Sequence, residues 1–129
     1  AKLAYATYQE LLREERWARL AAAGANPQRL LWASTGTKNP GYSDVLYVEE
    51  LIGPDTVNTM PPATLEAFRD HGTPRNSLTE DVAGARETLA ALERAGISLS
   101  RVTDRLLEEG VSLFVDSFDK LLGSLRAKI

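Results

Sequence analysis

The feature that most constrains the fold of this chain is an alternation of strand and helix signals between residues 30 and 68. Residues 30–35 form a short apolar run, and residues 55–60 are rich in β-branched side chains, so both are expected to be strands. A capping Ser-Asp pair precedes a helical pattern over residues 45–52, and two prolines suit the first turn of a helix over residues 61–68. Strands that alternate with helices are typical of βα units on a parallel sheet. The sequence therefore predicts an α/β fold.

Helical patterns lie on both sides of this alternation. Apolar residues recur at spacings of three and four, with Arg and Glu between them. These expected helices cover residues 3–22, 79–95, 102–109 and 111–128. Gly110 is expected to separate the last two, and residues 72–78 are expected to be a loop that could hold one more short strand.

Charge and composition exclude several classes of function. The chain has 129 residues, a length typical of one domain, and a net charge of −3, which gives no positive surface for nucleic acid or an anionic membrane. It has no cysteine, which excludes disulfides, thiolate metal sites and a cysteine nucleophile. No apolar run approaches the ~20 residues of a membrane span, and no signal peptide is recognisable. We therefore expect a cytoplasmic protein without nucleic-acid or membrane partners.

The most informative stretch for chemistry is residues 32–40, where the first strand would enter its loop. Ser34, Gly36 and Lys38 lie here, and ligands bind at this carboxyl edge of the strands in α/β folds. Hydroxyls and backbone amides can donate hydrogen bonds to phosphate oxygens, and a lysine adds a positive charge. The alternative is a capped polar turn with one exposed lysine. Asn58 and Thr59, at the end of the second strand, would lie near the same edge.

Other polar residues are predicted to be structural. His71 is the only histidine, and its place at a helix C-terminus favours a capping role over that of a base. No second histidine or suitable carboxylate pair accompanies it, so no metal site is expected. The acidic pairs 49–50 and 108–109 are expected to face solvent. Phe114 and Phe118 belong to an apolar helix face that packs on a core or, alternatively, forms an oligomer contact.

Three stretches together closely resemble the transaldolase family, in particular its longer bacterial members. They are residues 31–40 (LWASTGTKNP), 42–51 (YSDVLYVEEL) and 54–61 (PDTVNTMP). The resemblance extends to residues 15–17 upstream and to residues 108–111 and 117–122 downstream, so it covers nearly the whole chain. The chain also opens on Ala1 within a helical pattern, and we expect that an upstream part belongs to it.

The resemblance implies that residues 1–129 are the C-terminal segment of one transaldolase domain, part of a (β/α)8 TIM barrel comprising the last two to three strands with C-terminal helices. Such an enzyme transfers a dihydroxyacetone unit between sugar phosphates of the pentose phosphate pathway through a Schiff-base lysine and without a cofactor. In the family that lysine lies on an earlier strand. No catalytic residue is therefore expected in this chain, and the chain alone is expected to be inactive.

Two substrate-binding residues are carried over from the family pattern. Ser34 matches a substrate-contacting serine at the end of a barrel strand. In many relatives an arginine close behind that serine holds the substrate phosphate. In this chain the first positively charged residue after Ser34 is Lys38, which is therefore the candidate for that contact. Arg75 is a further candidate for a contact with the phosphate. Lys38 is not expected to be the nucleophile, because a polar loop keeps its ammonium form charged.

The expected partners are a sugar-phosphate substrate and the remaining N-terminal part of the barrel, with a homo-oligomer left open. The alternative function is a non-catalytic assembly or interaction fragment of α/β type, because a few strands taken from a barrel leave unpaired edges.

Overall fold

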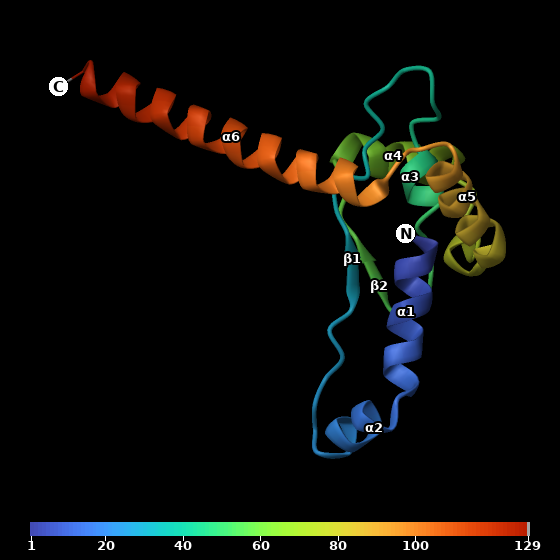
Figure 1. Cartoon of the computed structure of the whole chain (residues 1–129). Coiled ribbons are helices and arrows are strands. Elements are labelled where there is room, and N and C mark those ends of the chain that lie inside the picture. Colours follow the sequence, from blue (N-terminus) through green and yellow to red (C-terminus); the bar gives the residue numbers. More distant parts are fainter. Residues whose placement is uncertain (129) are drawn as a thin grey trace. The chain divides into compact units, whose positions relative to one another are not determined.

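The computed structural model describes residues 1–128. Its elements, labelled in Figure 1, follow one another as α1 (Lys2–Arg13), α2 (Glu15–Ala22), β1 (Leu30–Trp32), α3 (Leu46–Glu49), β2 (Thr56–Asn58), α4 (Pro62–His71), the 3-10 turn η1 (Ser77–Thr79), α5 (Val82–Arg94) and α6 (Leu99–Arg126). The chain divides into two compact units, residues 1–86 and residues 87–129.

The first unit contains a parallel pair of strands. β1 and β2 pair with Leu30 opposite Thr56, Leu31 opposite Val57 and Trp32 opposite Asn58. The pairing continues one step further, because the backbone N–H of Thr59 donates to the carbonyl of Trp32 at 2.9 Å. The strand–helix–strand–helix order over residues 30–71 confirms the α/β alternation expected from the sequence, although each strand has only three residues.

The core of the first unit lies on one face of this sheet. Tyr5 and Tyr8, three residues apart on one side of α1, pack with Leu78 of η1, which is fully buried. The Tyr5 hydroxyl also donates to the carbonyl oxygen of Pro54 at 3.1 Å. The partly buried residues around this cluster are Leu12, Leu30, Trp32 and Leu51.

The other face of the sheet is only partly covered in the first unit. Leu30 and Trp32 pack on the core, so Leu31 between them must point to the opposite side, and its side chain is 54% exposed. Val57 is paired with Leu31 and shares that face. Sheets of parallel strands normally have both faces covered.

Glycines explain where the sequence-based helix boundaries were right and wrong. Gly24 (φ 91°) and Gly96 (φ 78°) adopt the left-handed conformation that ends α2 and α5. Gly110 is not among the residues of positive φ and stays helical, so the expectation of two helices over residues 102–128 was wrong: α6 is one helix of 28 residues. The cost of an interior helical glycine, about 1 kcal/mol, does not by itself end a helix.

Two further boundaries differ from expectation in the first unit. The helix expected over residues 3–22 is broken at Glu14, whose ψ of 143° is extended. The loop over residues 72–78 contains the start of the 3-10 turn η1 rather than an additional strand. Within residues 1–128, no helix combines the length and the apolar character needed to cross a membrane.

Candidate site at the carboxyl ends of the strands

A buried threonine joins the carboxyl ends of β1 and β2. Thr35 is 2% exposed, and its Oγ1 lies 2.7 Å from Oδ1 of Asn58 and 3.1 Å from the carbonyl oxygen of Thr59. One hydroxyl proton cannot serve two acceptors. Both contacts are satisfied if the Asn58 amide is turned so that its NH2 group donates to Thr35, while Thr35 donates to Thr59. The end of β2 is thereby fixed against the residues that follow β1.

The next residue of this loop packs against the start of α4. A side chain on Gly36 would place its Cβ 3.2 Å from Cγ of Pro61 and 3.2 Å from Oγ1 of Thr64. Such contacts are tighter than ordinary packing, so this approach favours glycine. The loop after β1 and the loop after β2 therefore form one edge of the unit.

The two predicted substrate-binding residues both lie on this edge. Ser34 is exposed and has a φ of 58°, a left-handed conformation that is strained for residues other than glycine. Lys38 is exposed, four residues further along, and makes no ion pair within residues 1–128. Asn39 shapes the far side of the loop, since its Oδ1 accepts from the backbone N–H of Gly41 at 2.9 Å. The arrangement offers an exposed hydroxyl and an unpaired cation beside two joined strand ends.

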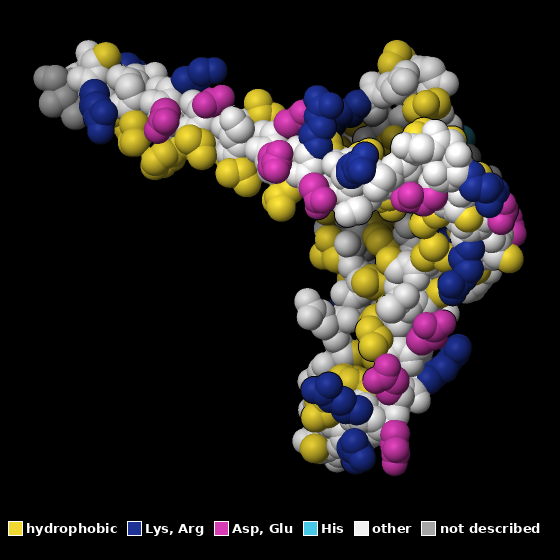
Figure 2. Space-filling model, in the orientation of Figure 1, with side chains coloured by type: hydrophobic (Ala, Val, Ile, Leu, Met, Phe, Trp, Pro, Cys, Tyr) yellow, Lys and Arg dark blue, Asp and Glu magenta, His cyan; other side chains and the backbone are white. Residues whose placement is uncertain are grey.

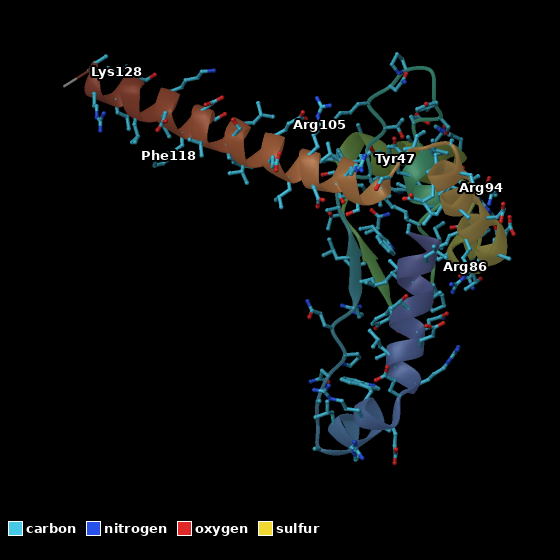
Figure 3. All side chains as sticks on the ribbon, viewed as in Figure 1. Tyr47, Arg86, Arg94, Arg105, Phe118 and Lys128 are labelled. Carbon is cyan, nitrogen blue, oxygen red and sulfur yellow. The ribbon has the colours of Figure 1, made fainter. Side chains whose placement is uncertain are left out.

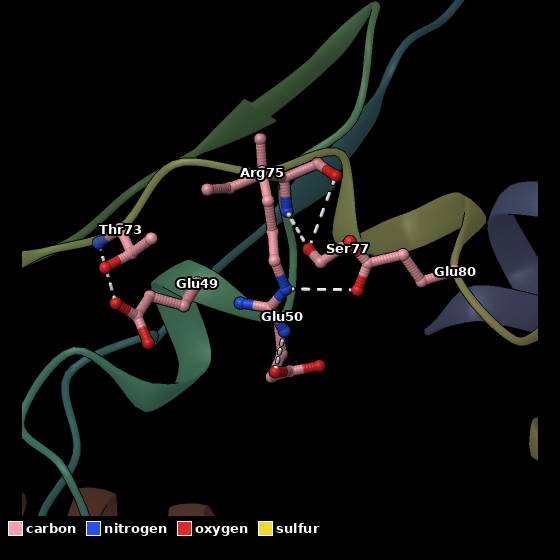
Figure 4. A network of polar contacts seen from close by, with 7 residues as sticks. Glu49, Glu50, Thr73, Arg75, Ser77 and Glu80 are labelled. Atoms are coloured by element: carbon pink, nitrogen blue, oxygen red, sulfur yellow. Dashed lines mark hydrogen bonds and ion pairs between the residues drawn. The ribbon is translucent and has the colours of Figure 1, made fainter.

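Arg75, the further candidate for a phosphate contact, is held elsewhere by carboxylates. Its guanidinium binds Glu50 and lies 3.0 Å from Oε2 of Glu80 (Figure 4). Glu50 first and Glu80 second raise the pKa of Arg75. Two residues further on, the Ser77 hydroxyl accepts from the backbone N–H of Ile52 at 3.1 Å, which places this segment beside the chain that leads into β2. Arg75 is therefore engaged by carboxylates, and no hydrogen bond or ion pair joins it to Ser34 or Lys38 within residues 1–128.

Arg75 belongs to a row of polar contacts between residues 44–52, around α3, and residues 71–80, which we call the α3 seam. Its contacts pair Asp44 with His71, Glu49 with the backbone N–H of Thr73, Glu50 with Arg75, and Ile52 with Ser77. Three of these contacts involve carboxylates, and Figure 4 shows those of Glu49 and Glu50. Glu49 and Glu50 remain partly exposed to solvent, as expected, but sequence reasoning missed their partners, which lie about 25 residues away and give no local signal.

His71 links the end of α4 to the loop before α3. Its Nε2 lies 2.8 Å from Oδ1 of Asp44, and its Nδ1 lies 3.2 Å from Oδ2 of Asp70. The hydrogen bond to Asp44, and then that to Asp70, raises the pKa of His71, while His71 lowers the pKa of Asp44. The predicted position at a helix C-terminus is confirmed, but sequence reasoning missed both carboxylates. No group of three or more His, Asp or Glu residues suited to a metal ion occurs in residues 1–128.

Two hollows of the first unit are not lined by Ser34 or Lys38. One, between α3, β2 and α4, has a mainly apolar lining that includes Val48, Leu51 and Phe68 and no charged residue. The other, between α1 and the turn before β2, is lined by Tyr8, Arg13 and Asp55 among others. Neither is lined by a residue of the loop that follows β1, although Asn58, which contacts Thr35, lines the first of them.

Comparison with known families gives one match over nearly the whole chain. Residues 1–125 match the model of the family described as Transaldolase/Fructose-6-phosphate aldolase.

Individual relatives agree with this match. The chain is 52% identical over 130 residues to "Transaldolase" of Parafrankia sp. (strain EAN1pec), covering 100% of the chain and 35% of the relative. It is 50% identical over 131 residues to "Transaldolase 2" of Nostoc punctiforme, covering 100% of the chain and 34% of the relative. It is 52% identical over 127 residues to "Transaldolase" of Thermobifida fusca, covering 95% of the chain and 33% of the relative. The chain thus spans about a third of the length of the curated relatives it matches.

Proposed function

Because the chain belongs to the transaldolase/fructose-6-phosphate aldolase family, we propose that it is the C-terminal segment of a transaldolase and supplies part of the sugar-phosphate site. The whole protein would transfer a dihydroxyacetone unit from a ketose phosphate to an aldose phosphate. The Schiff-base lysine would lie in the part of the relatives that this chain does not span. The chain alone would therefore not turn over substrate.

The observation that carries this proposal is the joined carboxyl edge of β1 and β2. Thr35 bridges to Asn58, and this bridge sets the position of the loop that bears Ser34 and Lys38. In barrels of alternating strands and helices, substrates bind at the carboxyl ends of the strands. The Ser34 hydroxyl would donate to or accept from a substrate oxygen, and the Lys38 ammonium would bind the phosphate as a point charge.

The partly covered face of the sheet supports the proposal that these strands belong to a (β/α)8 barrel. Leu31 is 54% exposed, Val57 on the same face is partly buried, and β1 and β2 pair only with each other among residues 1–128. In a barrel, further strands would continue the sheet on both sides, and inward-pointing side chains would cover this face.

A chimera tests the proposal directly. In it, this chain replaces the matching third of the Parafrankia transaldolase, to which it is 52% identical. We expect the chimera to transfer dihydroxyacetone from fructose 6-phosphate to an aldose phosphate. Replacing Lys38 by Ala should raise KM about 10- to 100-fold, because a charge-assisted hydrogen bond contributes about 1.5–3 kcal/mol.

Lys120→Ala is the matched control, because Lys120 lies on α6 in the second unit. This substitution should leave KM unchanged. An inactive but folded chimera would count against the transaldolase assignment. An active chimera with equal KM values for Lys38→Ala and the control would count against the role of Lys38 alone. For the isolated chain, fructose 6-phosphate and borohydride should leave no covalent adduct on any lysine.

The same partly covered face favours a second candidate, a non-catalytic assembly module. Unpaired strand edges and exposed apolar surface promote association even where no catalysis follows. In that case the chain would bind the other two thirds of the relative without restoring activity. Measured binding with no turnover would favour this function.

A further inference from the structure

The loop that follows β1 is anchored at its two ends and exposed between them. At its start Thr35 is buried, and Gly36 packs closely against the first turn of α4. At its end Val45 is buried directly before α3, which the label of Tyr47 marks in Figure 3. Residues 38–44 between these anchors are exposed, and the loop projects at the top of the view in Figure 1 and in Figure 2. Few contacts are therefore available to hold the part of the loop that carries the exposed lysine.

One side-chain contact ties the exposed part of this loop to a distant part of the chain. Oδ1 of Asp44 lies 2.8 Å from Nε2 of His71, the last residue of α4. Within residues 1–128, no other hydrogen bond or ion pair joins residues 38–44 to a residue beyond the loop and the start of α3. The backbone between Lys38 and this contact is restricted, because Pro40 fixes its own φ and limits the conformation of the residue before it. The position of the lysine therefore depends on the contact between Asp44 and His71.

The imidazole of His71 lies between two carboxylates. Its Nε2 faces Asp44, and its Nδ1 lies 3.2 Å from Oδ2 of Asp70. A protonated imidazole donates from both nitrogens, whereas the neutral ring donates from only one and turns a lone pair toward the other carboxylate. Within residues 1–128 no other charged side chain binds the ring, and Arg69 on α4 and Glu49 on α3 have partners of their own. The charged form of His71 therefore holds Asp44 more strongly than the neutral form does.

We propose that His71 is a positioning residue, which holds the loop after β1 through Asp44 so that Lys38 is placed to bind a substrate phosphate. This role rests on the function proposed above, in which Lys38 makes that contact. His71 acts through the loop and not on the substrate, because both of its ring nitrogens face carboxylates. Two anchors thus fix the loop, the buried Thr35 at its start and the contact between His71 and Asp44 near its end. The second anchor weakens as the pH rises through the pKa of His71.

The pH dependence of KM in the chimera tests this role. At about pH 6, His71→Ala should raise KM for fructose 6-phosphate about 3- to 10-fold, because the charge-assisted hydrogen bond to Asp44 is lost. The value of kcat should stay nearly the same, as expected for a loss of binding alone. His71→Gln keeps a hydrogen bond to Asp44 without titrating, so it should restore most of the loss. Between about pH 6 and pH 8, the ratio of KM in the unmodified chimera to KM in His71→Gln should rise. Titration of the substrate phosphate affects both proteins alike and cancels in this ratio.

Glu49→Ala is the matched control for this test. It removes the next contact of the α3 seam, the hydrogen bond that Glu49 accepts from the backbone N–H of Thr73 at 2.8 Å. That bond joins the same two segments without touching the exposed loop, so KM should not change. If Lys38→Ala raises KM and His71→Ala does not, the positioning role of His71 is wrong while the proposed function stands. If Lys38→Ala has no effect, the role of Lys38 fails and that of His71 fails with it. Equal increases of KM in Glu49→Ala and His71→Ala would also contradict the role of His71, since a general loss of stability would explain both.

Proteolysis of the 129-residue chain tests the hold on the loop without any enzymatic activity. A protease that cleaves after lysine should cut at Lys38, and His71→Ala should raise the rate of this cut about 3- to 10-fold at about pH 7. The cut at Lys120 in α6 is the internal reference, and Glu49→Ala should leave the rate at Lys38 near that of the unmodified chain. Equal rates at Lys38 in His71→Ala and in the unmodified chain would overturn the role of His71, whether or not the chimera is active.

Discussion

Two neighbouring threonines in the loop after β1 have opposite hydrogen-bonding states. The Thr35 hydroxyl contacts Asn58 and Thr59, whereas the buried Oγ1 of Thr37 has no hydrogen-bond partner within residues 1–128. Replacing Thr35 by Val keeps the shape of the side chain but leaves two polar groups unsatisfied. The free energy of unfolding, measured in urea, should fall by about 1–3 kcal/mol.

Thr37→Val is the matched control for this prediction. It removes a buried hydroxyl that makes no hydrogen bond, so the free energy of unfolding should stay the same or rise by up to about 1 kcal/mol. Equal losses from both substitutions would mean that the bridge from Thr35 to Asn58 contributes nothing beyond side-chain shape.

The sequence could reveal some of these residues and not others. Ser34, Gly36 and Lys38 form a continuous polar loop after an apolar run, and that local pattern is enough to predict a strand-end site. The role of Thr35 depends on Asn58, 23 residues away, and on a parallel register that places their side chains together. Residue type alone does not tell the hydrogen-bonded Thr35 from the unbonded Thr37. The difference between them comes from tertiary contacts, which give a hydrogen-bond partner to Thr35 only.

At the scale of elements, the α3 seam joins α3 to the segment after α4 and includes a titratable contact. His71 has a pKa raised above its usual value near 6.5, chiefly by Asp44 and then by Asp70. Its protonated form therefore stabilises the fold fully below the unfolded-state pKa, and this contribution is lost as the pH rises through the higher folded-state pKa. We expect the urea midpoint to fall between about pH 6 and pH 8 for this reason.

His71→Gln tests the origin of this pH dependence. Glutamine can still hydrogen-bond to Asp44 but does not titrate, so the fall in the urea midpoint across this pH range should be smaller in the variant. Asp44 has a lowered pKa because of His71, and its contribution should be lost only as the pH falls through that lowered value, below about 4. An unchanged profile in His71→Gln would assign the pH dependence to other groups.

Element boundaries were predictable where local geometry decides them. Gly96 ends α5 because it is left-handed, and the backbone N–H of Ile97 then donates to the carbonyl of Leu92 at 2.9 Å. Gly110 looks the same in the sequence but remains helical within α6. The break at Glu14 has no glycine or proline to mark it. Helix ends of this kind depend on packing that no short sequence window contains.

At the scale of the whole molecule, the first unit has one packed sheet face and one partly covered face. Leu30 packs with the cluster of Tyr5, Tyr8 and Leu78, whereas Leu31 is 54% exposed on the other side. Both residues are leucines in the same three-residue strand, so their difference reflects only the face to which each points. If the chain is a segment of a barrel, the partly covered face is the one that the rest of the barrel covers.

The last prediction compares Leu30 and Leu31 in the isolated chain and in the chimera. Leu31→Ala should change the free energy of unfolding of the isolated chain by less than about 1 kcal/mol, because an exposed leucine loses little on truncation. In the chimera the same substitution should cost about 2–5 kcal/mol, as expected for a leucine buried in a core. Leu30→Ala should destabilise both proteins, since its packing lies within the first unit. If Leu31→Ala were equally mild in the chimera, its face would remain uncovered and the strands would not close into a barrel.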